Sequence, residues 1–111
     1  AKAAAEFISS VTSELSEIYP VPSNWPDSID PYLRNRFPKL QIAVEKFRPY
    51  LKDKKGFDNA WKLYRVGDEH RDIDKQVYHQ YMGFNIVGKS KIIPEERFRE
   101  NIDRLLSYAQ T

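Results

Sequence analysis

The chain has 111 residues, the length of a single domain, and its 18 basic residues against 16 acidic ones give a net charge of +2. This near balance argues against a dedicated nucleic-acid-binding domain, because such domains carry a marked basic excess. The absence of cysteine excludes disulfides, thiolate metal sites and cysteine nucleophiles.

The first element expected is a helix that starts at Ile8. Its apolar residues recur three or four positions apart and share one helix face: Ile8, Val11, Leu15 and Ile18. Pro20 should end this helix, because the residue before a proline avoids the helical conformation. The loop over 20–26 that follows carries Trp25, which we expect to cover the edge of the core.

The second helix has the strongest apolar pattern. It is expected to begin at Asp30, a capping residue followed by a first-turn proline. Six residues at helical spacing form its buried face: Leu33, Phe37, Leu40, Val44, Phe47 and Leu51. Pro38 lies inside this pattern and lacks the N–H that a helix interior needs. Since the spacing continues across Pro38, we favour one bent helix ending near Pro49 over two separate helices.

A charged turn over 52–56 leads to a shorter third helix that Gly67 should end. The apolar residues of this helix are Phe57, Ala60, Trp61 and Tyr64. The polar stretch 68–72 is expected to form a surface loop. After it, Ile73, Val77 and Tyr81 recur at intervals of four and allow one further short helix.

The last helix is expected to begin at Pro94, with Glu95 and Glu96 at the positive end of the helix dipole. Its buried face comprises Phe98, Ile102, Leu105, Leu106 and Ala109. No helix is long enough for a free coiled coil, so the pattern predicts an all-α fold, a three- to four-helix bundle over 1–111. The stretch 1–7 fits a cloning linker as well as native sequence.

Residues 83–90 match the phosphate-binding pattern G-x-x-x-x-G-K-[ST] letter for letter. The pattern functions when a buried strand precedes it and a helix begins at its Lys-Ser end. Here the preceding residues 74–80 are polar, and Pro94 interrupts any helix starting at Ser90. We interpret the match as coincidental and expect an irregular or β-hairpin insertion over 82–93, turning at Gly88 and Lys89.

Other candidates for chemistry have no supporting spacing. His70 and His79 lie near four acidic residues, Asp68, Glu69, Asp72 and Asp74, but in an order that matches no metal-ligand pattern. The serines and threonines lie mostly on the polar face of the first helix, far in sequence from both histidines. We therefore expect no catalytic residue, no metal, no cofactor and no enzymatic activity.

A basic segment suggests an alternative function. Its cations are Lys52, Lys54, Lys55, Lys62 and Arg65. Trp61 and Tyr64 lie between them and would allow stacking on nucleic-acid bases, although their spacing favours a buried position. The alternative is thus a nucleic-acid-associated helical protein that uses the 52–65 face.

Three strings are similar to a pattern in small uncharacterised helical proteins of bacteria and prophages: AVEKFR over 43–48, FDNAWKLY over 57–64 and IDRLLSYA over 102–109. The resemblance implies a helical fold and a bacterial cytoplasm. It rests on core residues, and it implies no activity and no site residues.

The function expected from these patterns is that of a non-enzymatic interaction or accessory module that binds another protein or itself. No apolar run approaches the roughly 18 residues that span a bilayer, and no signal-peptide pattern is present, so a cytoplasmic location is expected. The 82–93 insertion is the expected contact surface, because its apolar residues lie outside the helical faces. The candidate contact residues are Phe84, Ile86, Lys89 and Ile92.

Overall fold

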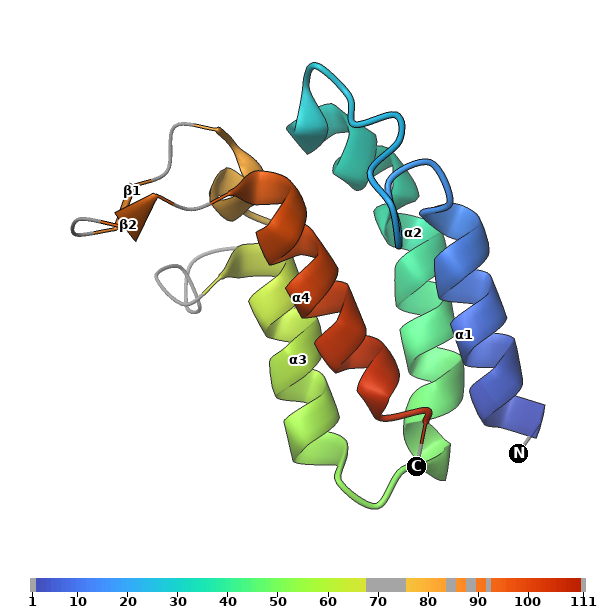
Figure 1. Ribbon diagram of the computed structural model, residues 1–111. Coiled ribbons are helices and arrows are strands. Elements are labelled where there is room, and N and C mark those ends of the chain that lie inside the picture. Colours follow the sequence, from blue (N-terminus) through green and yellow to red (C-terminus); the bar gives the residue numbers. More distant parts are fainter. Residues whose placement is uncertain (1, 68–75, 84–85, 88–89, 92, 111) are drawn as a thin grey trace.

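The computed structural model describes residues 2–67, 76–83, 86–87, 90–91 and 93–110, and for 86–87 and 90–91 only the backbone. Its main elements are four helices that run alternately up and down (Figure 1): α1 (Lys2–Glu14), α2 (Ile29–Phe47), α3 (Lys54–Val66) and α4 (Pro94–Ser107). The expected all-α helical bundle is confirmed. In the part of the chain described, no helix is long and apolar enough to cross a membrane.

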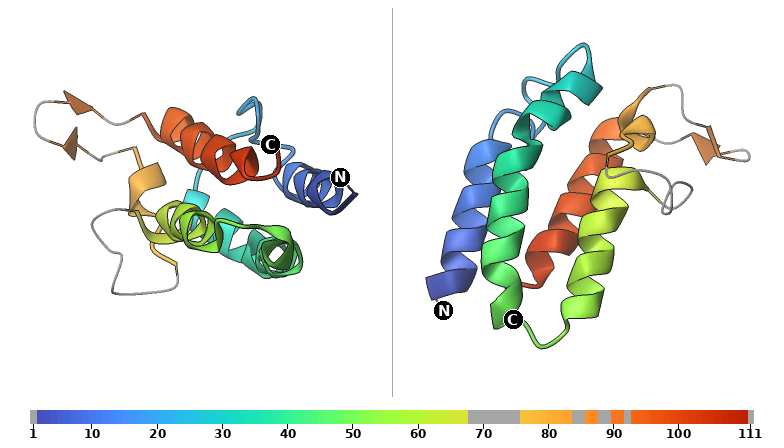
Figure 2. Two further views of the ribbon diagram at one scale, coloured as in Figure 1. Left: turned by 90° about the horizontal axis from the view of Figure 1, so that it is seen from below. Right: turned by 180° about the vertical axis from the view of Figure 1, so that it is seen from behind.

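The helices form two packed pairs around one aromatic core. α1 packs on α2, and α3 packs on α4. Seen along the bundle, α1 and α4 lie in one layer and α2 and α3 in the other (Figure 2, left). This arrangement places the apolar face of each helix toward the middle of the bundle.

Three phenylalanines join α1, α2 and α3 near the end of the bundle where the chain starts. The ring of Phe7 stacks on that of Phe47 at 4.7 Å between centroids, and Phe57 meets these rings edge-on at 5.6 and 5.8 Å. Phe7 is only 2% exposed. The first helix therefore begins at Lys2 and not at Ile8, because Phe7 extends its buried face by one turn.

The second helix is continuous through Pro38, as expected. Figure 1 shows its N-terminal part inclined to the rest, in keeping with the kink that an interior proline causes. It ends at Phe47, and a 3₁₀ turn, η1 (Arg48–Tyr50), contains Pro49. Four of the six expected core residues are buried, namely Leu33, Leu40, Val44 and Phe47, while Phe37 and Leu51 are partly buried.

The start of α2 differs from expectation. Ser28, and not Asp30, is the residue that precedes the first helical turn. The Asp30 carboxylate instead accepts a hydrogen bond from Arg34 Nε at 2.8 Å. The pairing is of the i,i+4 type that supports helices, so Asp30 stabilises the first turn from within it.

Helices α3 and α4 follow the predicted pattern. The Asp53 carboxylate caps α3 by accepting the Gly56 N–H at 2.8 Å, and Gly67 ends the helix with φ of +74°. α4 begins at Pro94. All nine predicted core residues of the two helices are buried: Phe57, Ala60, Trp61, Tyr64, Phe98, Ile102, Leu105, Leu106 and Ala109. Trp25 packs edge-on against Phe98 at 5.7 Å, which confirms its place at the edge of the core.

The further short helix expected around Ile73, Val77 and Tyr81 is absent from the described residues 76–83. Ile73 and the expected loop 68–72 lie outside the described residues, and 76–83 contains only a 3₁₀ turn, η2 (His79–Tyr81). The reason is that the segment hydrogen-bonds to α3: the Val77 N–H donates to the Arg65 carbonyl at 2.7 Å. The Val77 N–H thus bonds to a carbonyl of α3, where a helix would have bonded it to a carbonyl four residues earlier.

A short β-hairpin occupies part of the 82–93 insertion, which is one of the two alternatives expected there. Strand β1 (Ile86–Val87) pairs antiparallel with β2 (Ser90–Lys91), with Val87 opposite Ser90. This register leaves positions 88 and 89 for the connection, although both lie outside the described residues. The two strands project from the side of the bundle, beyond the end of α3 and the start of α4 (Figures 1 and 2).

Candidate protein-contact site

The base of the insertion is tied to the end of α3 by side chains. The last carbonyls of a helix lack partners within the helix. Here Gln80 Nε2 donates to the carbonyls of Leu63 and Tyr64 at 2.7 and 3.2 Å. The Tyr81 hydroxyl donates to the Tyr64 carbonyl at 2.8 Å. The turn η2 therefore serves as the C-terminal cap of α3.

Asn101 connects this cap to α4. Its Nδ2 donates to Gln80 Oε1 at 3.1 Å and to the Tyr81 hydroxyl oxygen at 3.0 Å, and the residue is only 2% exposed. Burial raises the pKa of the Tyr81 phenol above its usual value, so the hydroxyl keeps the proton that it donates. The sequence analysis did not predict this network. The available signal was Asn101 itself, a polar residue on the apolar face of the helix, three positions after Phe98 and next to Ile102.

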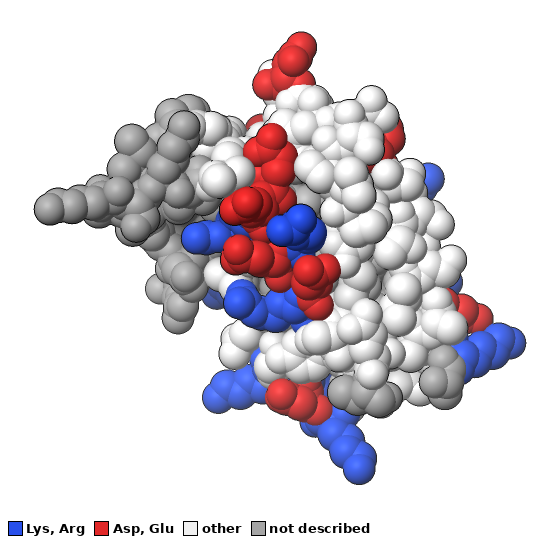
Figure 3. Space-filling model, in the orientation of Figure 1, with Lys and Arg blue, Asp and Glu red and all other residues white. Residues whose placement is uncertain are grey.

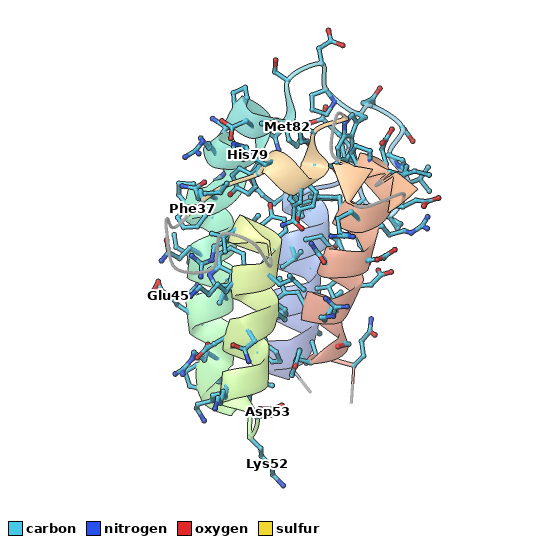
Figure 4. The ribbon with its side chains drawn as sticks, turned by 90° about the vertical axis from the view of Figure 1, so that its left-hand side faces the viewer. Phe37, Glu45, Lys52, Asp53, His79 and Met82 are labelled. Atoms are coloured by element: carbon cyan, nitrogen blue, oxygen red, sulfur yellow. The ribbon has the colours of Figure 1, made fainter. Side chains whose placement is uncertain are left out.

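Beyond this anchor the chain leaves the bundle with apolar residues on both sides. Met82 is partly buried against the core, whereas Gly83 is exposed, and a Cβ placed on it would meet no atom of the described residues within 4 Å. On the return path, Ile93 is 48% exposed. Figure 4 shows Met82 and His79 at one end of the bundle and Lys52 and Asp53 at the other. The candidate site is thus a rigidly anchored extension at one end.

The structure places the four candidate contact residues only in part. The backbone of Ile86 begins β1. Phe84, Lys89 and Ile92 lie outside the described residues. Ile93 was not among the sequence candidates. It belongs to the same insertion, and an isoleucine directly before the helix-starting Pro94 was the available signal.

The phosphate-binding pattern does not have the backbone geometry that it requires. Ser90, which should lie in the first turn of a helix, is in strand β2, and α4 begins only at Pro94. No helix N-terminus therefore stands at the Lys-Ser end of the pattern to attract a phosphate.

The aromatic residues of the basic 52–65 face are covered by protein. Trp61 is 7% exposed and Tyr64 is fully buried. The Trp61 ring stacks on Phe37 at 5.8 Å, and the Arg65 guanidinium lies 5.2 Å from its centroid. Neither ring is open to a nucleic-acid base, so the alternative function would have to use cations without stacking.

No metal site is found among the described residues, which contain no group of three potential ligands. His79 is exposed on η2. The other histidine, His70, and its acidic neighbours Asp68, Glu69, Asp72 and Asp74 lie outside the described ranges.

Comparison with known proteins adds no relative from which a role could be transferred. No protein-family model, curated protein or solved structure matches this chain.

Proposed function

We propose that this protein is a non-enzymatic interaction or accessory module that binds another protein through the 82–93 insertion. The observation that carries the proposal is the position of Ile93, which is 48% exposed beside a hairpin that projects from the bundle. An apolar side chain that a projecting segment exposes is available for contact with another protein.

The hairpin supports the proposal through its backbone. In the described part of the chain the sheet consists of β1 and β2 alone. A two-stranded sheet has two outer edges, and an unpaired edge is a template for pairing with an extended segment of a partner. The anchor at Gln80 and Asn101 supports it as well, because a segment held at its base loses less conformational freedom on binding.

Site-specific photo-crosslinking in cells that naturally produce the protein tests this proposal. A photoreactive residue at position 93 should give an adduct with one defined partner, or with a second copy of the chain. The matched control is position 42, because Ile42 is also an isoleucine and is 55% exposed, on α2. The proposal expects no such adduct from position 42.

The partner identified by crosslinking is then purified, and its affinity is measured for the unmodified protein, the Ile93→Ser variant and the Ile42→Ser variant. Ile93→Ser should weaken binding by about tenfold, which is the effect of removing an apolar contact worth about 1.4 kcal/mol. Ile42→Ser should bind like the unmodified protein. Equal labelling at both positions, or equal affinity of both variants, would overturn the assignment of the insertion as the contact surface.

A further inference from the structure

A groove lies between α3 and α4, and its described lining includes no residue of the 82–93 insertion. Its volume is about 460 Å³, within the range of small-molecule sites. α3 and its C-terminal cap contribute Gly56, Asn59, Ala60, Lys62, Leu63 and Gly67, and the opposite wall is formed by Arg104 and Tyr108. The groove is thus built by two helices that the core holds rigidly together.

The groove lining combines an apolar floor with cationic and neutral polar groups. Ala60 is buried, and Leu63 and Tyr108 are partly buried, so they present aliphatic and aromatic surface at the bottom. Lys62, Arg104 and Asn59 offer N–H donors from the two walls. Among the described residues of the lining there is no carboxylate.

The two cations are available to a ligand. Neither Lys62 nor Arg104 takes part in the three ion pairs of the described residues, which involve Arg34, Arg36 and Arg48. Asp53, near the Gly56 end, is engaged in capping α3. Two cations that line one groove from different helices, with no carboxylate among its described lining residues, form a complementary site for an anion.

We propose that the α3–α4 groove binds a small organic anion, with its phosphate or carboxylate between Lys62 and Arg104 and its apolar body on Leu63 and Tyr108. The surrounding surface limits the affinity. Figure 3 shows that acidic and basic side chains gather together over α3 and α4. Glu100, exposed one helical turn before Arg104, is close enough to repel an anion bound there. Removal of that carboxylate should therefore strengthen binding.

Phenyl phosphate is the probe, because it joins an anionic group to an aromatic body. Its binding is followed by ¹⁵N–¹H NMR, with benzoate and inorganic phosphate as further anions and benzamide as a neutral compound of similar shape. Phenyl phosphate should shift the signals of Asn59, Lys62 and Gly67 in a saturable manner. Benzoate distinguishes a carboxylate from a phosphate as the preferred group, and inorganic phosphate shows what the apolar floor contributes. Benzamide should not bind.

Three variants test the placement of the charges. Lys62→Gln combined with Arg104→Gln should weaken phenyl phosphate binding by at least about tenfold, since a charge-assisted hydrogen bond is worth roughly 1.5–3 kcal/mol. Lys46→Gln combined with Arg99→Gln removes the same charge from exposed positions outside the groove and should change the affinity by less than about twofold. Glu100→Gln should tighten binding.

The proposal is overturned if none of the three anions gives saturable shifts in the groove. It is also overturned if the two double variants lose affinity equally, because binding would then reflect net charge only. Circular dichroism melts check that the double variants are folded. The four substituted residues are exposed or partly buried, so we expect little loss of stability.

Discussion

Two buried tyrosines differ in what their hydroxyl groups contact. The Tyr81 hydroxyl donates to the Tyr64 carbonyl and accepts from Asn101. The Tyr64 hydroxyl has no hydrogen-bond partner among the described residues, although its side chain is fully buried. A buried polar group without a partner costs about 1–3 kcal/mol, so the Tyr64 hydroxyl group lowers the stability of the fold, whereas the Tyr81 hydroxyl group raises it.

Replacing each tyrosine by phenylalanine should therefore have opposite effects. Tyr64→Phe should leave the free energy of unfolding unchanged or raise it by about 1 kcal/mol, because no hydrogen bond is lost. Tyr81→Phe should lower it by about 1–2 kcal/mol, because two hydrogen bonds are lost. Urea denaturation measures both. Equal losses would mean that the Tyr64 hydroxyl is satisfied in solution.

At the scale of the elements, the glycine that ends α3 and the glycine that ends the 76–83 segment differ in backbone requirements. Gly67, which ends α3, has φ of +74° and ψ of 178°, a region that only glycine adopts readily. The described glycines include no other with positive φ, and Gly83 lies in open space. The end of α3 thus requires glycine at position 67 because of its backbone conformation, whereas position 83, before the hairpin, does not require glycine.

A matched pair of glycine substitutions tests this difference. Gly67→Ala should lower the free energy of unfolding by about 1–3 kcal/mol, the cost of holding a residue with a side chain in this conformation. For a domain of this size each kcal/mol corresponds to about 4–8 °C in melting temperature. Gly83→Ala should change the melting temperature by only a few degrees. Comparable losses in both variants would contradict the assignment.

At the scale of the whole molecule, tyrosine burial makes stability depend on alkaline pH. Burial raises the pKa of Tyr64 and of Tyr81 above the usual value. In the unfolded chain both phenols ionise near pH 10. Above that pH the unfolded state binds fewer protons than the folded state, so the free energy of unfolding falls as pH rises. Below it these two groups contribute no pH dependence.

Urea denaturation below and above about pH 10 should show this fall, at about 1.4 kcal/mol per pH unit for each tyrosine. Tyr64→Phe removes one contribution and should make the fall shallower by that amount. Tyr50→Phe is the control, because Tyr50 is 72% exposed whereas Tyr64 is fully buried. A similar change in slope for both variants would contradict burial as the cause.

Helical periodicity located the four helices and most of their core from the sequence. Leu33 and Leu40 in α2, and Phe98 and Leu105 in α4, are buried where their spacing predicts. Periodicity does not report a contact between residues that are distant in sequence. Phe7 lies in a stretch that resembles a linker, yet it stacks on Phe47, forty residues further along the chain.

The candidate site could be predicted only as a segment. A lapse of helical periodicity and the Gly88-Lys89 dipeptide located the hairpin, because both signals are local. The Gln80–Asn101 anchor and the groove between Lys62 and Arg104 depend on helices that meet only after folding. Their distances and charge environment follow from packing and not from spacing along the chain.

The sequence by itself determined the helical class, the bend at Pro38, the stop at Gly67 and the position of the hairpin, because each depends on residues within a few positions of one another. The tertiary structure alone decided that 76–83 caps α3 and does not form a helix. The carbonyls at the end of α3 accept hydrogen bonds from Gln80 and Tyr81. These side chains lie 16 or 17 residues further along the chain, so no local sequence pattern indicates the contact.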